Sequence, residues 1–144
     1  AQGPRRADVP VADFERMVDL NLKPTFLVTR AALPKLLAAG GGSVVCVSSR
    51  TALEPARGGA GYSVGKAAVL AFVKAVDADY REDKIRCNAV LPSVIDTPAN
   101  REAMPNTDPD IWVKPQQLAE TIDFLLSDES AATSGATIPV YARA

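Results

Sequence analysis

The chain has 144 residues, of which 47% are hydrophobic and 23% charged, and its formal net charge is −1. This is about the size of one ordinary domain, and the hydrophobic content excludes a disordered chain. The pI near 5.4, without a block of basic residues, argues against nucleic acid and anionic membranes as partners.

No apolar run approaches the roughly 18 residues of a membrane span, and the first ten residues lack the apolar core of a signal peptide. A cytoplasmic location is therefore expected. Histidine is absent, which excludes Ser-His-Asp triads, Cys-His nucleophiles and His-ligated zinc. Cys46 and Cys87 lack CxxC spacing, so we expect buried free thiols and no metal site.

The first expected element is a helix over residues 11–39, where apolar side chains recur at spacings of three and four. Pro24 predicts a kink around residues 20–23, because proline removes a backbone hydrogen bond and clashes with the preceding turn. Asn21 lies in that kink. The glycines at 40–42 then end the helix.

A strand is expected over residues 43–48, because the run VVCV is apolar and β-branched, as in a buried parallel strand. Ser49 follows directly, and reactive groups in α/β sheets gather beyond the carboxyl ends of the strands. A loop rich in Gly, Pro and Arg leads to Tyr62, which opens a helix that is expected to run to about Arg81.

Tyr62 and Lys66 lie on one face of this helix, because residues four apart stack on each other. An ammonium about 4 Å from a phenol oxygen, at an effective dielectric of about 20, stabilises the phenolate by about 4 kcal/mol. Tyr62 is therefore a candidate general acid or base that can meet Ser49. Tyr80 and Lys84 repeat the spacing without a serine thirteen positions earlier, and we interpret them as a solvated helix end.

The helix after Tyr62 is apolar and small on almost every face, so we expect it to pack on the sheet and on a partner helix. A strand over 85–91 follows. The polar stretch 99–112 is long for a structureless connection and is interpreted as a substrate lid. A helix over 115–127 and a strand over 137–141 complete the chain. The alternation of strands and helices predicts an α/β fold with a parallel sheet.

Ser49, Tyr62 and Lys66, at these spacings after a buried strand, resemble the active site of the short-chain dehydrogenases/reductases. The resemblance covers nearly the whole chain and implies a Rossmann-like, doubly wound parallel sheet. No glycine-rich strand-to-helix turn precedes the first helix. Residues 1–144 are therefore expected to form the C-terminal catalytic portion of one such domain, with residues 1–10 as the loop that leaves a preceding strand.

The resemblance implies NAD(P)-dependent interconversion of a carbonyl and an alcohol by hydride transfer. Tyr62 would exchange the proton, Lys66 would stabilise the phenolate and hold the nicotinamide ribose, and Ser49 would orient the substrate oxygen. NLKP resembles a family stretch whose asparagine holds a water behind the lysine, which assigns the water relay to Asn21. The alternative for Asn21 is a residue that caps the helix or solvates the kink.

The stretch PSVIDTP resembles the family's PGxVxTP loop, with Ser93 in place of the usual glycine. The resemblance implies cofactor contacts by Pro92, Ile95 and Thr97, besides those of the tyrosine and the lysine. The alternative for Thr97 is an ordinary helix cap before Pro98. The cofactor is NAD or NADP, and the substrate is a small carbonyl or alcohol whose identity stays open.

The resemblance also implies a homo-dimer or homo-tetramer, formed through the helices at 11–39 and 62–81. The competing hypothesis is a truncated, non-catalytic chain that acts at most as an assembly module. A GxxxGxG-type turn encoded upstream in the same chain would distinguish the two.

Overall fold

The computed structural model describes residues 8–144, so most of the expected leading loop lies outside the described residues. The elements, in chain order, are α1 (Val11–Ala38), β1 (Gly42–Val47), η2 (Arg50–Ala52), α2 (Ala60–Tyr80), β2 (Ile85–Pro92), α3 (Pro98–Ala103), η3 (Pro109–Ile111), α4 (Pro115–Leu126), η4 (Asp128–Ser130) and β3 (Thr137–Val140).

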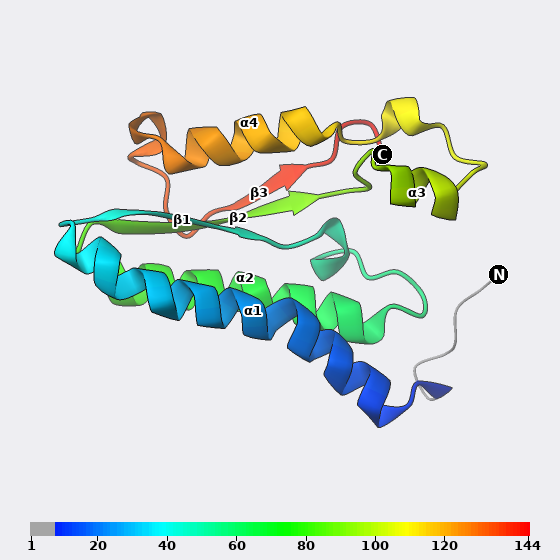
Figure 1. The fold of residues 1–144 in the computed structure, drawn as a ribbon, viewed down its shortest axis with the longest axis horizontal. Coiled ribbons are helices and arrows are strands. Elements are labelled where there is room, and N and C mark those ends of the chain that lie inside the picture. Colours follow the sequence, from blue (N-terminus) through cyan, green and yellow to red (C-terminus); the bar gives the residue numbers. More distant parts are fainter. Residues whose placement is uncertain (1–7) are drawn as a thin grey trace.

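Within residues 8–144 the sheet has three strands in the order β1-β2-β3, and both pairs are parallel. Gly42 pairs with Ile85, and Ala89 pairs with Thr137. Helices α1 and α2 cover one face of the sheet and α4 covers the other (Figure 1). All three strands point toward the end of the molecule where α3 and the C-terminus lie (Figure 1). The predicted α/β fold with a parallel, Rossmann-like sheet is confirmed.

The central strand β2 is buried along almost its whole length and carries much of the core. Its core residues pack with α2, α1 and β1 in one cluster: Leu33, Cys46, Val69, Val73, Val76, Ile85, Cys87, Ala89 and Leu91. Both cysteines are free and buried, as predicted. The hydrogen bond between Cys87 and Cys46, together with burial, raises the pKa of the Cys87 thiol well above its ordinary value.

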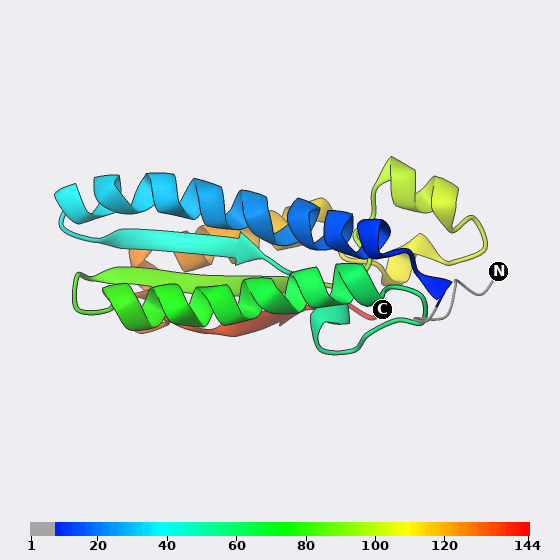
Figure 2. The same cartoon turned by 90° about the horizontal axis from the view of Figure 1, so that it is seen from below.

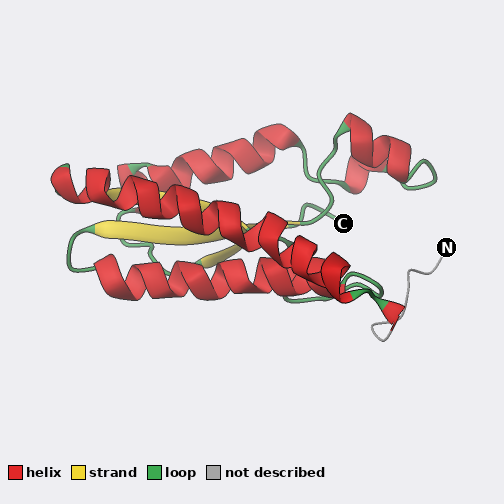
Figure 3. Cartoon of the chain, turned by 60° about the horizontal axis from the view of Figure 1, so that its bottom comes forward, coloured by secondary structure: helices red, strands yellow, loops and turns green. Residues whose placement is uncertain are grey.

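Helices α1 and α2 lie side by side on the sheet (Figures 2 and 3). Two glycines of α2 allow this close approach, since a Cβ on Gly61 would lie 2.9 Å from the Cβ of Met17. A Cβ on Gly65 would lie 3.0 Å from the Cβ of Asn21. The prediction that this helix packs on both the sheet and a partner helix is confirmed.

Pro24 does not break α1, which continues through it to Ala38. The helix bends along its length, and its first turns diverge from the sheet (Figure 1). Pro24 offers no N–H to the carbonyl of Leu20, and the hydroxyl of Thr25 donates to the carbonyl of Asn21 at 3.3 Å. The helix therefore accommodates the proline by bending and is not divided into two helices.

A buried carboxylate fixes the turn that leads into β3. Asp77 of α2 is 3% exposed and accepts hydrogen bonds from Ser134 and Arg81. Gly135 adopts a φ of +68°, and a Cβ there would lie 2.7 Å from Oδ2 of Asp77. The hydrogen bond from Arg81 is the main cause that lowers the pKa of the Asp77 carboxyl.

Candidate active site

A cavity of about 400 Å³ lies beyond the carboxyl ends of β1 and β2. The three predicted catalytic residues Ser49, Tyr62 and Lys66 all line it. Two predicted cofactor contacts, Pro92 and Ile95, line it as well. The structure therefore brings together residues that are up to 46 positions apart in the sequence. Asn21 and Thr97 lie outside the cavity lining and are described below.

The two serines that follow β1 have different surroundings. Ser48 is 2% exposed, and its hydroxyl donates to the carbonyl of Lys66 at 2.8 Å, which ties the end of β1 to α2. Ser49 begins η2, and its Oγ lies 3.3 Å from the amide nitrogen and 3.0 Å from Oγ1 of Thr51. The contacts with Thr51 hold Ser49 at the cavity wall, whereas the hydrogen bond of Ser48 joins β1 to α2.

Tyr62 stands in the first turn of α2, 37% exposed, with a cation beside its ring. The Nζ of Lys66 lies 5.8 Å from the ring centroid. That Nζ also donates to the carbonyl of Val47 at 3.1 Å, so the ammonium bridges α2 and the end of β1. Burial lowers the pKa of the Lys66 ammonium. A phenol, a cation and the hydroxyl of Ser49 thus share one wall of the cavity.

Asn21 lies behind this wall, on the neighbouring helix. It packs against Gly65, the residue before Lys66, and its Nδ2 donates to the carbonyl of Met17 at 2.7 Å. The side chain therefore bonds within α1, but it neither caps the helix nor reaches the carbonyl of Leu20 that Pro24 leaves free. Its position next to the lysine is the one expected for the water relay, which stays a prediction.

The loop after β2 is held by β3 and by α3. Ser93 donates from its hydroxyl to the carbonyl of Tyr141 at 2.8 Å, so the serine in place of the usual glycine has a defined role. Thr97 caps α3 by accepting from the backbone N–H of Asn100 at 3.2 Å. The capping alternative thus describes Thr97 in this structure, and its contact with a cofactor stays a prediction.

Sequence reasoning missed Asn100 and Met104, which line the cavity from the side of α3. Both residues lie in the segment 99–112 that was interpreted as a lid, and the polar composition of that segment did not lead us to expect an ordered helix. The signal was present in the Thr97-Pro98 start, which is typical of a capped helix N-terminus. Given that start, the spacing of four between Asn100 and Met104 places them on one face.

Among the described residues, the charged side chains that line the cavity are Arg50 and Lys66, and no carboxylate does. Arg50 donates to Glu54 and to the carbonyl of Ala144, and its guanidinium lies 5.0 Å from the ring centroid of Tyr141. Arg50 is thus paired within the chain, and Lys66 supplies the main positive charge at the cavity. Residues 8–144 contain no cluster of three or more His, Cys, Asp or Glu placed to hold a metal ion.

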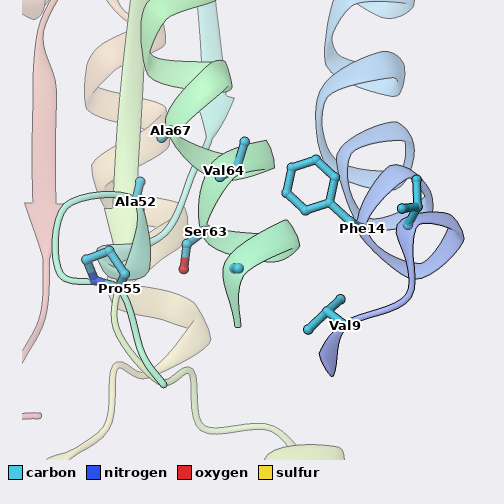
Figure 4. A pocket seen from close by; sticks show the side chains of 9 residues that line it. Val9, Phe14, Ala52, Pro55, Ser63, Val64 and Ala67 are labelled. Carbon is cyan, nitrogen blue, oxygen red and sulfur yellow. The ribbon is translucent and has the colours of Figure 1, made fainter. Parts of the chain in front are cut away.

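A second cavity of about 520 Å³ has a separate lining, and we call it the apolar groove. Phe14 and Val9 line one side of it, and Val64, Ala67 and Pro55 face them (Figure 4). Ser63 also lines the groove, and within the described part of the chain its buried hydroxyl has no hydrogen-bond partner. None of the predicted catalytic residues lines this groove.

The parallel sheet, with Ser49, Tyr62 and Lys66 gathered at one cavity beyond its strand ends, defines an α/β protein with a candidate active site. The sequence matches the family described as Enoyl-(Acyl carrier protein) reductase over residues 2–142. The chain belongs to the short-chain dehydrogenase/reductase family, as the resemblance implied. The helices of the part that the structure describes include none that is long and apolar enough to cross a membrane.

Relatives from animals and bacteria agree with this assignment. The chain is 32% identical to dehydrogenase/reductase SDR family member 4 of Bos taurus, over 92% of this chain and 51% of the relative. It is 33% identical to 2-(R)-hydroxypropyl-CoM dehydrogenase of Xanthobacter autotrophicus, over 90% of this chain and 56% of the relative. The chain thus spans about half the length of the curated relatives it matches.

Solved structures extend the comparison. A 3-oxoacyl-[acyl-carrier protein] reductase with bound NAD from Brucella melitensis superposes with a TM-score of 0.85 at 28% identity. The match covers 99% of this chain and 55% of that protein. At the level of the family, the chain is therefore related to oxidoreductases that use a nicotinamide cofactor.

Proposed function

We propose that this chain is the catalytic half of an NAD(P)-dependent oxidoreductase that interconverts a carbonyl and an alcohol. The observation that carries the proposal is the convergence of Ser49, Tyr62 and Lys66 on one cavity beyond the strand ends. Membership of the short-chain dehydrogenase/reductase family supports it. Under the competing hypothesis, the chain is a non-catalytic assembly module that keeps these three residues without using them.

In this proposal the bound nicotinamide supplies or takes the hydride. Tyr62 donates its phenolic proton to the carbonyl oxygen during reduction and accepts the hydroxyl proton in the reverse direction. The Lys66 ammonium beside the ring stabilises the phenolate. Ser49 donates a hydrogen bond to the substrate oxygen, which holds the carbonyl in reach of the phenol and disperses its developing charge.

The cavity suits one face of a nicotinamide group. Pro92 and Ile95 provide apolar wall, and Lys66 provides donors for the ribose hydroxyls. Thr97 keeps its hydroxyl proton available, because its Oγ1 acts as the acceptor in the cap of α3. Asn21, packed behind the lysine, would hold the water that returns protons to the phenol. Either NAD or NADP fits these contacts.

The pyrophosphate of a dinucleotide normally rests on a helix N-terminus after a glycine-rich turn. The three strands within residues 8–144 carry no such turn. We propose that a dinucleotide-binding half acts together with these residues. The chain alone should then show very weak or no binding of NAD(H) and NADP(H), and a longer chain with that half should bind them.

Calorimetric titration of the 144-residue chain with all four cofactor forms is the test of this division. Absent or barely measurable heat is the expected result. Micromolar binding to the chain alone would show that the residues holding the dinucleotide have been misassigned. The longer chain serves as the positive control.

We also propose that the protein self-associates through α1 and α2. The apolar groove and its rim expose Val11, Phe14 and Val64, which are 73%, 37% and 47% exposed. A second copy of the chain is the proposed occupant, because an apolar surface on two adjacent helices suits helix-to-helix packing. The edge of β1, unpaired in the described part of the sheet, is a second place where chains could associate.

A further inference from the structure

Asp96 is the centre of an ion cluster at the foot of α3. Its Oδ1 accepts from Nε of Arg101 at 2.6 Å, and its Oδ2 accepts from Nη2 of the same arginine at 2.9 Å. The Nζ of Lys114 donates to Oδ2 as well, at 2.9 Å. The Asp96 side chain is 10% exposed. One carboxylate thus receives two hydrogen bonds from α3 and one from the start of α4.

The same residues close the backbone loop that contains α3. Ile95 and Val113 form a parallel bridge, in which the N–H of Asp96 donates to the carbonyl of Val113 at 2.8 Å. Lys114 also donates to the carbonyl of Pro109 at 3.0 Å. The segment 97–112 therefore leaves and rejoins the body at one point, where Asp96 and Lys114 stand together.

The same segment also contributes to the candidate active site. Asn100 and Met104 line the cavity that also holds Ser49 and Tyr62. Asn100 is fixed by a hydrogen bond from its Nδ2 to the carbonyl of Ile95 at 2.8 Å. The short helix is thus tied to Asp96 through Arg101, while Asn100 and the residue after its last turn, Met104, line the cavity.

We propose that Asp96 is a positioning residue, which clamps α3 through Arg101 and Lys114 so that Asn100 and Met104 form a wall of the substrate cavity before substrate binds. This inference rests on the proposed function for the identity of the cavity's guest. A six-residue helix has little stability of its own, so its position depends on such contacts. The thioether of Met104 then selects substrates by the space it leaves.

The clamp stays charged over the ordinary pH range. The hydrogen bonds from Arg101 and then Lys114 hold the pKa of Asp96 far below its usual value. Asp110 is the other acid facing the cluster, with its Oδ1 3.8 Å from Nζ of Lys114. A depressed pKa means that the clamp is complete above about pH 4, the ordinary value for aspartate, and weakens only as the pH falls further. Salt should loosen it, because Arg101 is 55% exposed.

The test compares the parent chain with Asp96→Asn, using two measurements that need no turnover. Hydrogen exchange should speed up by about tenfold for the amides of α3 alone, because the clamp holds this helix against local opening. Oxidation of Met104 by hydrogen peroxide, compared with Met17 in the same molecule, should also accelerate. Asp96→Glu should restore part of both effects, since it keeps the charge.

Asp123→Asn is the matched control, because it removes an exposed carboxylate from α4. Unchanged exchange in α3 of the Asp96→Asn variant would overturn the proposal. Faster exchange that spreads equally through β1 and β2 would also overturn it, because Asp96 would then serve the whole fold.

Steady-state kinetics in a longer chain that carries the dinucleotide-binding half tests whether the clamp affects substrate binding. Asp96→Asn and Met104→Ala should each raise KM for the carbonyl substrate by several-fold with little change in kcat, since they alter the wall and leave the reacting groups in place. An equal fall in kcat and kcat/KM would overturn the positioning role. If the longer enzyme shows no turnover at all, the proposed function fails, and the exchange and oxidation measurements still decide the clamp.

Discussion

Ser48 and Ser49 are adjacent in the sequence, yet the end of β1 gives them separate tasks. Both residues line the cavity, but the buried hydroxyl of Ser48 donates to the carbonyl of Lys66, whereas the Oγ of Ser49 accepts from Thr51 and keeps its own proton available. The strand fixes this difference, because consecutive residues in extended backbone point to opposite sides. Substitution of Ser48 should therefore affect mainly stability, and substitution of Ser49 mainly activity.

We predict opposite consequences for the two alanine variants. Ser48→Ala should lower the free energy of unfolding by about 1 kcal/mol, because it removes a buried hydrogen bond. Ser49→Ala should change stability little and should sharply reduce turnover in the longer enzyme. Urea denaturation and steady-state kinetics on both variants measure this. Equal loss of stability in the two variants would contradict the assignment.

The cysteines give a second prediction at the residue scale. Cys46 is 5% exposed and Cys87 is fully buried, and the thiol of Cys87 has a raised pKa. The hydrogen bond with Cys87 lowers the pKa of the Cys46 thiol, so burial is what keeps Cys46 from reagents, while Cys87 is both buried and held as the thiol. Neither cysteine should therefore react with a thiol reagent in the folded chain at neutral pH. Both should react in denaturant. Fast labelling of the native chain would show that the core of the sheet opens readily.

The sequence identified Ser49, Tyr62 and Lys66 because their spacing follows from a strand, a loop and one helical turn. It could not identify Asn100 or Met104. Their position depends on where α3 is clamped, and the clamp joins Asp96 to Lys114 across 18 positions of sequence. The Thr97-Pro98 start could have placed both residues on one face of a short helix, but contacts between distant polar residues leave no periodic signal, so the sequence does not show that this face lines the cavity.

Among the elements, α2 does the most to organise the fold. It carries Tyr62 and Lys66 at its start, packs on α1 through Gly61 and Gly65, and holds the turn before β3 through Asp77. The strands and long helices were predictable to within one or two residues, because their apolar runs are long. The segment 99–112 was less predictable, since α3 and η3 are short and polar.

Asp77 provides a prediction about pH. Its lowered pKa means that the stabilisation is complete above about pH 4, the ordinary value for aspartate, and is lost as the pH falls through the lower folded value. Asp77→Asn should therefore lower the free energy of unfolding at pH 7 by about 2 kcal/mol, and the difference from the parent should shrink on acidification. Denaturant titrations from pH 7 to pH 3 measure it. A difference that is constant over this range would contradict the role of the carboxylate.

At the scale of the whole molecule, the described chain exposes apolar side chains on α1 and α2. Those of Phe14 and Val64 lie on opposite sides of the apolar groove (Figure 4). On the other side of the sheet, α4 exposes apolar residues such as Phe124 and Leu126. The self-association that we propose is assigned to the groove, because there two adjacent helices, with Ala52 and Pro55, together form a concave apolar surface.

Val64→Asp should shift the chain toward the monomer, because a charge in the groove would be buried without a partner in the assembled state. Leu126→Asp, at a site exposed to a similar degree on α4, is the control and should leave the assembly unchanged. Sedimentation equilibrium measures both. If the control dissociates the assembly and Val64→Asp does not, association uses α4 or its surroundings.

The central claim is that Tyr62 is the acid–base group of a hydride-transfer site, and one comparison tests it most directly. In a longer chain that carries the dinucleotide-binding half, the turnover of Tyr62→Phe is measured against that of the parent, with cofactor affinity determined on the same samples. The phenylalanine keeps the ring and removes only the hydroxyl. We predict that turnover is abolished while the affinity for the cofactor stays nearly unchanged. Turnover that survives in Tyr62→Phe would contradict the account.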